Sequence, residues 1–116
     1  YGDWHSQGDT LQAVQNHSPA NPFANPGFAD LTAHVDFEAI ARAAHAFSRV
    51  TQQGVFLERL GITARAQALA KGLTGDALEA HIGAHRRLTH PDEMGRLFKV
   101  IGLYPTKGSA PPGLDP

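Results

Sequence analysis

The chain has 116 residues, a formal net charge of −1 and no cysteine. Domains usually contain about 100–150 residues, so this length allows one domain at most. The near-neutral charge offers no basic surface for a nucleic acid or an anionic membrane, and the lack of cysteine excludes a disulfide scaffold, a thiol nucleophile and a zinc–thiolate site. No apolar run approaches the roughly 20 residues of a membrane span. Because the first residue is Tyr1 rather than methionine, we expect a processed chain or a piece of a longer one.

Residues 1–36 show no sustained hydrophobic periodicity. Asn, Ser, Pro and Gly dominate the stretch 16–27, which predicts turns within a long loop. Loops of this length are usually functional or disordered. Just upstream, Asp9, Thr10 and Gln12 stand before a possible helical turn. The simplest interpretation is that Asp9 or Thr10 caps a helix and that Gln12 faces solvent.

The stretch 30–37 alternates polar and apolar residues. Its polar members are Asp30, Thr32, His34 and Asp36. In an extended segment all four would lie on one face, directly before a helix N-terminus, where they could line a binding pocket. The alternative is an edge segment with its polar face in water and Asp36 as a helix cap, and the residues by themselves favour this alternative.

Asp36 is predicted to start an amphipathic helix. Its carboxylate can accept hydrogen bonds from the free N–H groups of the first turn, and Glu38 adds favourable charge there. Apolar residues then recur at spacings of three and four from Phe37 to Phe47. This spacing places them on one helix face.

Two glycines and two threonines divide the next part of the chain into short helices. Gly61 and Gly72 are predicted to end helices, and Thr63 and Thr74 are predicted to cap the helices that follow them. The helices expected are residues 52–60, 64–71 and 75–88.

A strand is predicted at residues 97–104, after a short turn over 89–95 that ends at its glycine. The stretch is β-branched, aromatic and almost uniformly apolar, which is typical of a strand covered on both faces. The candidate partner in this chain is a short segment at 49–51, and an isolated two-stranded pair is marginal in water. We therefore expect the strand to belong to a sheet whose other members lie elsewhere. Residues 105–116 form a tail rich in proline and glycine.

Residues outside these elements give weak chemical signals. His81 and His85 have a metal-ligand spacing on a helix, but Ile82 stands where a zinc protease has glutamate, so packed or exposed histidines are the favoured interpretation. The pair Arg86-Arg87 is explained by interaction with the helix dipole, with phosphate binding as the minority interpretation. The chain contains no glycine-rich phosphate loop and no nucleophile elbow. It therefore carries no complete catalytic constellation.

Several short motifs occur in a fixed order along the chain. They are Tyr1-Gly2, Gly8–Val14, Pro26-Gly27, Asp30–Phe37, Thr51–Gly54, Phe56–Ile62, Arg87–Gly95 and Leu97–Val100. As an ordered set covering nearly the whole chain, they resemble the C-terminal part of the MidA family of S-adenosylmethionine-dependent methyltransferases. That family includes the mitochondrial arginine methyltransferase that assists the assembly of respiratory complex I.

The resemblance implies an α/β fold, the C-terminal portion of a class I (Rossmann-like) methyltransferase, which in this chain is mostly α-helical with one or two short strands. Residues 1–104 would form the C-terminal part of the methyltransferase domain, with residues 52–88 as a helical insertion. Residues 105–116 would be a Pro/Gly-rich tail.

The resemblance also implies a cofactor, a reaction and a set of site residues. S-adenosyl-L-methionine would be bound mainly by the missing N-terminal part, and the full-length parent would methylate arginine in a protein. The isolated chain is expected to be inactive, and no metal is expected. Carboxylates suit an arginine acceptor because they pair with guanidinium through charge-assisted hydrogen bonds. The implied residues are Asp30, His34 and Asp36 for catalysis, Asp9, Thr10, Gln12 and Thr32 for substrate binding, and Tyr1 and Gly2 for cofactor binding.

The implied partner is a protein substrate, with a respiratory complex I subunit as one candidate, and neither nucleic acid nor membrane insertion is expected. A bacterial cytoplasm is the first expectation for location and the mitochondrial matrix the second. A function of another class also stays open, a small α-helical interaction module without catalytic activity. A helical or exposed segment at 97–104 would favour the module, and a strand there with an unpaired apolar edge would favour the methyltransferase.

Overall fold

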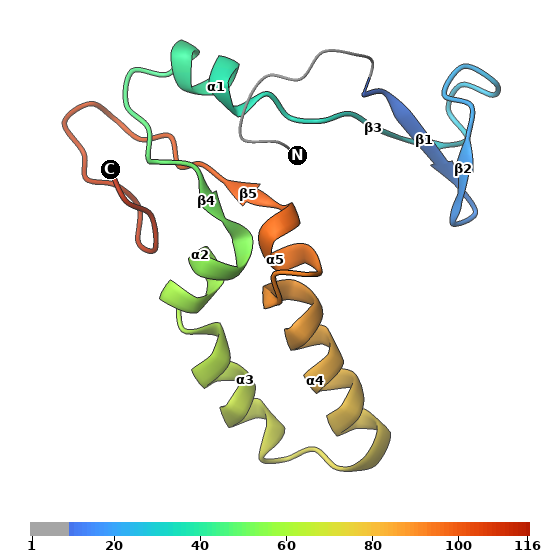
Figure 1. Cartoon of the computed structure of the whole chain (residues 1–116), viewed down its shortest axis with the longest axis vertical. Coiled ribbons are helices and arrows are strands. Elements are labelled where there is room, and N and C mark those ends of the chain that lie inside the picture. Colours follow the sequence, from blue (N-terminus) through green and yellow to red (C-terminus); the bar gives the residue numbers. More distant parts are fainter. Residues whose placement is uncertain (1–9) are drawn as a thin grey trace. The chain divides into compact units, whose positions relative to one another are not determined.

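The computed structural model describes residues 10–116, which fall into two compact units, residues 10–38 and Ala39–Pro116 (Figure 1). Tyr1, Gly2 and Asp9, which carry three of the predicted site roles, lie outside the described residues. Both helices and strands are present, so the mixed α/β class is confirmed, but the described part has five short strands instead of one or two. None of its helices is long and apolar enough to cross a membrane.

The first unit is a three-stranded antiparallel sheet. Its strands are β1 (Gln12–Gln15), β2 (Ser18–Ala20) and β3 (Asp30–Thr32), with β1 in the middle (Figure 1). Asn16 and His17 close the β1–β2 hairpin with φ angles of 49° and 61°. Positive φ at both positions gives the two-residue turn whose twist suits a hairpin.

This hairpin corrects two expectations from the sequence. The helical turn predicted after Gln12 is wrong, because β1 forms hydrogen-bonded pairs with strands on both sides. The stretch 16–27 is not entirely loop, because it contains β2. Its remainder is built from turns as predicted, with the amide of Ala24 donating to the carbonyl of Asn21.

Helix α1 (Phe37–Ala43) begins directly after Asp36, as predicted. It ends well before Phe47, so the predicted helix is too long. Phe47 instead forms an antiparallel bridge with Leu103.

The second unit contains a small antiparallel ribbon. Its assigned strands are β4 (Thr51–Gln52) and β5 (Lys99–Val100). The strand predicted at 97–104 is therefore present but much shorter than expected. Its partner is the segment that the sequence offered as a weak candidate.

Backbone hydrogen bonds continue this ribbon beyond the assigned strands. Near one end the amide of Gln53 donates to the carbonyl of Phe98 at 2.9 Å, and at the other the amide of Tyr104 donates to the carbonyl of Ala46 at 3.3 Å. The two segments thus run side by side over most of the predicted length.

A bulge interrupts the ribbon in its middle. Ser48 hydrogen bonds to Gly102, whereas the next paired residues are Thr51 and Val100. One segment advances by three residues while the other advances by two, so the first carries one extra residue, which defines a β-bulge.

The hydroxyl of Ser48 completes the hydrogen bonding at this bulge. The amide of Ser48 donates to the carbonyl of Gly102 at 2.9 Å, but the amide of Gly102 donates to Ser48 Oγ, also at 2.9 Å. In a regular antiparallel pair the acceptor would be the backbone carbonyl of the opposite residue. The Ser48 side chain is fully buried (0% exposed), so this hydroxyl stands in for a backbone acceptor away from water.

Four helices make up the rest of the second unit. They are α2 (Gln53–Arg59), α3 (Ile62–Ala70), α4 (Gly75–Thr89) and α5 (Met94–Leu97). Gly61 separates the first two with a φ of 83°, which confirms it as a helix stop. Two details of the prediction are wrong, because Thr63 lies inside α3 rather than capping it, and Gly95 lies inside α5 rather than ending a turn. Thr74 does occupy the cap position of α4, but its side chain makes no capping hydrogen bond.

Helices α2, α4 and α5 meet at two glycines. Gly54 and Gly95 are both buried, and a Cβ atom on either would collide with the carbonyl oxygen of Thr89 at the end of α4. A Cβ on Gly54 would also lie 3.2 Å from the Cα of Gly95. Only glycine allows the three backbones to come this close. We call Gly54, Gly95 and the Thr89 carbonyl the glycine junction.

The tail folds back on the second unit. Arg59 forms an ion pair with Asp115 at 2.9 Å, and the amide of Arg49 donates to the Asp115 carbonyl at 2.9 Å. Gly113 packs against Phe56 and adopts a φ of 83°. The proline- and glycine-rich composition did not predict these contacts.

Replacing Gly54 with alanine is expected to destabilise the chain by about 1–3 kcal/mol, because the new methyl group has no room at the glycine junction. The matched control is Gly83→Ala in α4, where a Cβ meets open space and the same substitution should stabilise by about 0.5–1 kcal/mol. Urea unfolding followed by circular dichroism measures both. Equal stability of Gly54→Ala and the unchanged chain would contradict the close approach.

Ser48→Ala is expected to cost about 1–3 kcal/mol, because it leaves the Gly102 amide without its acceptor in a buried place. Ser109→Ala, at an exposed position of the tail, should change stability by less than about 0.5 kcal/mol. Chemical denaturation of the two variants in parallel gives the difference. A change below that level for Ser48→Ala would show that another group satisfies the amide.

Candidate functional site

The first unit places predicted site residues from two strands on one face of its sheet. In the β1–β3 pair Gln12 lies opposite Thr32, and Val14 lies opposite Asp30. Residues directly opposite each other in an antiparallel pair project to the same side, and so do residues two apart on one strand. Gln12, Asp30 and Thr32 therefore share a face, together with the apolar Val14.

A hydrogen bond extends this arrangement past the ends of the strands. The amide of His34 donates to Thr10 Oγ1 at 3.1 Å, which keeps these two residues next to each other. Asp36 follows His34 by two residues and precedes α1. We call Thr10, Gln12, Asp30, Thr32 and His34 the polar face.

The other side of the sheet mixes apolar and polar residues, with Ala13 and Leu31 on the same side as Gln15 and Ser18. Ala13 is 3% exposed and is the one hydrophobic residue of the described chain that is fully buried. Leu31, which lies opposite Ala13 in the register, is 60% exposed. The alternation predicted from residues 30–37 is thus present over β3, with polar and apolar residues on opposite sides.

Side chains of the polar face are accessible to solvent. Gln12, Asp30, Thr32 and His34 are exposed, and Thr10 is half-buried. A carboxylate accepts hydrogen bonds, an imidazole accepts or donates, and hydroxyl and amide groups do both. Such a set can bind and orient a cationic, hydrogen-bond-donating group.

Sequence reasoning named every residue of this face but did not foresee how they meet. The structure brings together the predicted substrate residues Thr10, Gln12 and Thr32 with the predicted catalytic residues Asp30 and His34. The signal that could have revealed this is the short turn at residues 16–17 between two extended segments. A hairpin there makes β1 available as a partner for β3.

The two histidines of α4 have structural partners. His81 Nε2 lies 2.9 Å from the Ala66 carbonyl, and His85 Nε2 lies 3.0 Å from Thr63 Oγ1. Both partners belong to α3, so each imidazole joins the two helices. No cluster of three or more metal-ligating side chains occurs in residues 10–116.

Arg86 of the basic pair also has a partner. Its Nε donates to Glu93 Oε1 at 2.8 Å, across the end of α4. This ion pair provides a structural role for Arg86 beside the helix dipole.

Two surface hollows of the second unit lack an acidic side chain for the ribose of a nucleoside cofactor. Such ligands occupy clefts of about 300–1,000 Å³, and an acidic side chain commonly binds their ribose hydroxyls. One hollow, between α3 and α4, measures about 200 Å³, and the other, along α4 towards Met94, about 540 Å³. Neither has a carboxylate in its lining. Neither hollow therefore has the acidic side chain that commonly binds the ribose of such a cofactor.

Comparison with known proteins shows which family the first half of the chain resembles. Residues 1–55 match a family described as "Putative S-adenosyl-L-methionine-dependent methyltransferase". This segment contains the whole polar face. The resemblance to this methyltransferase family, predicted from the ordered motifs, is thereby confirmed.

Two curated relatives show which methyltransferases the chain resembles in sequence. The chain is 33% identical over 110 residues to the mitochondrial protein arginine methyltransferase NDUFAF7 homolog of Drosophila melanogaster, and 34% identical to NDUFAF7 of Xenopus laevis. In both comparisons the match covers 90% of this chain and 25% of the relative. The chain thus spans about a quarter of the length of these relatives.

Two crystal structures from Burkholderia thailandensis have a similar fold. The first, of an uncharacterized protein, has a TM-score of 0.69 and 32% identity, covering 87% of this chain and 28% of that one. The second, of a related protein bound to S-adenosyl-homocysteine, has a TM-score of 0.67 and 28% identity, covering 87% and 27%. The chain is therefore related to part of a larger methyltransferase-like protein.

Proposed function

We propose that this chain is the C-terminal part of a class I methyltransferase that modifies arginine in a protein, and that the polar face belongs to the acceptor site. The observation that carries the proposal is the meeting of Thr10, Gln12, Asp30, Thr32 and His34 on one side of the sheet. The matched family segment, residues 1–55, includes all of them. Curated relatives named as protein arginine methyltransferases support the choice of acceptor.

The chemistry of the polar face fits a guanidinium group. Asp30 is exposed and can accept paired hydrogen bonds from two guanidinium nitrogens, a geometry that fixes the acceptor as well as binding it. Gln12 and Thr32 lie on the same side and can orient the remaining N–H groups. Substrate binding is the role proposed for both.

Methyl transfer requires alignment of the acceptor and removal of a proton from it. His34 and Asp36 are the proposed bases, since each is an acceptor for that proton next to the guanidinium site. The cofactor, S-adenosyl-L-methionine, supplies the methyl group when it is bound. We propose that the part of the parent outside this chain holds most of it, with Tyr1 and Gly2 at the border and Asp9 on the substrate side.

The remaining expectations are proposals of the same kind. Residues 1–104 are assigned to the methyltransferase domain, residues 52–88 to a helical insertion and residues 105–116 to a tail. A protein substrate is the proposed partner, with a respiratory complex I subunit as one candidate. A bacterial cytoplasm is the proposed location, with the mitochondrial matrix as the alternative.

The segment 97–104 bears on the competing proposal of a non-catalytic interaction module. A helical or exposed segment would favour the module, whereas a strand with an unpaired apolar edge favours part of a larger sheet-containing enzyme. Leu97 lies in α5, and both Leu97 and Leu103 are about half exposed. From Phe98 to Tyr104 the segment is extended and pairs with residues 46–53. This pairing supports the methyltransferase assignment.

The isolated chain is expected to show no saturable binding of S-adenosyl-L-methionine in the micromolar range, because most of the cofactor site is proposed to lie in the part of the parent outside this chain. Isothermal titration calorimetry with the 116-residue chain tests this, with the Burkholderia thailandensis relative that binds S-adenosyl-homocysteine as the positive control. Tight binding by the chain alone would refute the proposal that the rest of the parent protein holds most of the cofactor.

In a full-length parent that carries this sequence, Asp30→Asn is expected to lower methyl transfer by about 100-fold or more, because removal of the charge weakens guanidinium binding and alignment. Its melting temperature should change by less than about 3 °C, since Asp30 is exposed. Asp76→Asn, at an exposed carboxylate of α4, is the matched control and should retain activity. If Asp30→Asn loses stability in step with activity, its role is structural and the acceptor-site proposal fails.

A further inference from the structure

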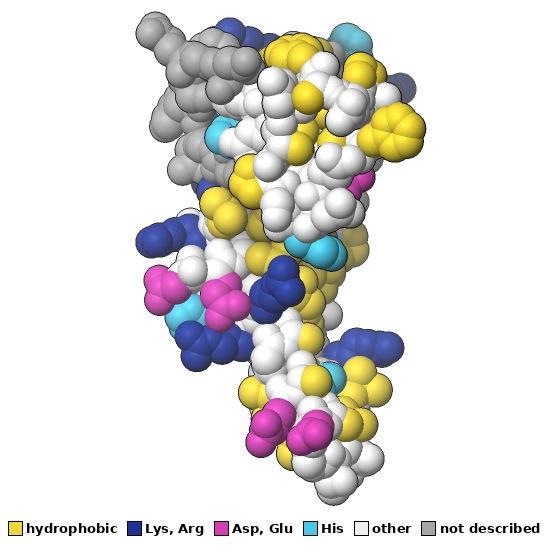
Figure 2. All heavy atoms as spheres, turned by 90° about the vertical axis from the view of Figure 1, so that its right-hand side faces the viewer, with side chains coloured by type: hydrophobic (Ala, Val, Ile, Leu, Met, Phe, Trp, Pro, Cys, Tyr) yellow, Lys and Arg dark blue, Asp and Glu magenta, His cyan; other side chains and the backbone are white. Residues whose placement is uncertain are grey.

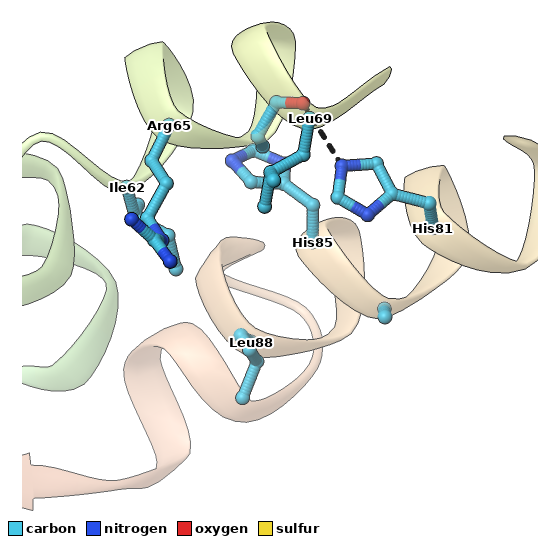
Figure 3. Close-up of a pocket in the computed structure, with 8 residues that line it drawn as sticks. Ile62, Arg65, Leu69, His81, His85 and Leu88 are labelled. Carbon is cyan, nitrogen blue, oxygen red and sulfur yellow. Dashed lines mark hydrogen bonds between the residues drawn. The ribbon is translucent and has the colours of Figure 1, made fainter. Parts of the chain in front are cut away.

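The hairpin of α3 and α4 carries an apolar hollow on its surface (Figure 3). Its volume is about 200 Å³, which is below that of a pocket for a drug-sized ligand and suits one large aliphatic or aromatic side chain. The apolar part of the lining consists of Ile62, Ala66 and Leu69 from α3 and Ala84 and Leu88 from α4. Leu69 is 52% exposed, so an apolar partner could still bury much of it.

Both histidines of the lining are already engaged. His81 Nε2 must donate to the Ala66 carbonyl, because a carbonyl only accepts (Figure 3). Thr63 donates its one hydroxyl proton to Glu58 Oε1 at 2.6 Å, so His85 Nε2 must donate to Thr63 Oγ1. The Nε2–H groups of both imidazoles thus link the two helices and are not available to a ligand.

Arg65 is the permanently charged residue of the lining. Figure 3 shows it projecting from α3 on the side of the hollow near Ile62. Within the described residues, Glu93 forms an ion pair with Arg86, and Asp115 forms one with Arg59. Arg65 has no such ion pair in residues 10–116, so its guanidinium can bind a carboxylate from outside.

The lining of the hollow contains no carboxylate. Helix α3 contains no acidic residue, and the acidic residues of α4, Asp76 and Glu79, are absent from the lining. In Figure 2 hydrophobic side chains lie at the surface of the lower helices, with two neighbouring carboxylates among them. Glu58 lies 3.9 Å from His85 Nε2, but its Oε1 accepts the Thr63 hydrogen bond.

We propose that the α3–α4 hollow is a docking site for an acidic amphipathic helix of a partner protein, which inserts one aliphatic side chain into the hollow and pairs a carboxylate with Arg65. Two antiparallel helices leave an open groove, and a third helix packed along it buries apolar surface on all three. The positive, acid-free lining selects a partner helix of negative charge. This site is separate from the acceptor site proposed for the polar face.

A second copy of this chain is a poor occupant for the hollow. Its exposed helices include α1, with the sequence FEAIARA, in which Glu38 and Arg42 balance each other. The amphipathic helix α4 carries Asp76 and Glu79 but also Arg86 and Arg87, so its acids and bases balance as well. No helix within residues 10–116 therefore has a net negative charge to complement Arg65.

Binding of a designed peptide to the 116-residue chain tests the proposal. The probe is a fluorescent 18-residue helix with leucines on one face and glutamates on the other, and its counterpart has lysine at each glutamate position. Fluorescence anisotropy at about 0.15 M salt should show saturable binding of the glutamate peptide and at least tenfold weaker binding of the lysine peptide. Arg65→Glu should reverse this preference, and Leu69→Ser should weaken the glutamate peptide about three- to tenfold while leaving the circular dichroism spectrum unchanged.

The matched control is Arg87→Glu, which makes the same charge change on the hairpin at a residue outside this hollow. It should weaken the glutamate peptide less than threefold, because the Debye length at this salt is about 8 Å. Equal effects of Arg65→Glu and Arg87→Glu, or equal binding of the two peptides, would overturn the proposal in favour of unspecific attraction. Self-association of the chain in sedimentation that is abolished by Leu69→Ser would assign the hollow to a second copy. Failure of the glutamate peptide to bind a full-length parent would assign it to the parent's own residues.

Discussion

The close approach of Gly54, Gly95 and the Thr89 carbonyl is the constraint on which the second unit depends. Helix α2 begins directly after β4, and α5 ends just before β5, so the contact between these helices sets where the two strands start to pair. The amide hydrogen bond from Gln53 to the Phe98 carbonyl lies at this point. A second bond, from the Gln53 side chain to the Leu88 carbonyl, ties the same residue to the end of α4. Two of the motifs that mark the family likeness, around Gly54 and Gly95, are thus explained by packing rather than by chemistry.

In the first unit the position of the polar face depends on a turn. The two-residue connection at Asn16 and His17 fixes which residues of β1 and β2 are paired, and β1 in turn pairs with β3. If the pairing of β1 with β3 shifted by one residue, the residue opposite Gln12 would no longer be Thr32. It would be a neighbour of Thr32, whose side chain projects to the other side of the sheet. The residues proposed to bind the acceptor contribute little to stability themselves, because they are exposed. Their arrangement is maintained by backbone pairing and by the buried Ala13 behind them.

Helices α1 to α4 were predictable because each has apolar residues at helical spacing, and α2 and α3 also end near a glycine, Gly61 and Gly72. The start of α1 after Asp36 followed from the change of period at that residue. The hairpin was missed because its strands are short, contain a proline and are joined by Asn-His rather than by a pair that includes glycine. The polar alternation of residues 30–36 gave half of the candidate site, and the contribution of β1 required knowledge of strand pairing. The strand at 97–104 was overestimated because an apolar run shows neither where a ladder is interrupted nor what covers it.

The bulge near Ser48 shifts the alternation of side chains along the ribbon by one residue. Side chains on a regular strand alternate, so Ser48 and Thr51, three residues apart, would normally point to opposite sides. Both are buried here, at 0% and 9% exposure, and both hydroxyls donate to the carbonyl of Arg49. The extra residue makes this possible, because it resets the alternation between the segment that follows α1 and the strand that leads into α2. Loss of one residue at this point would leave the composition of the ribbon almost unchanged. It would nevertheless turn every side chain on one side of the deletion to the wrong face. The structure therefore constrains the number of residues in this segment more strictly than their identity.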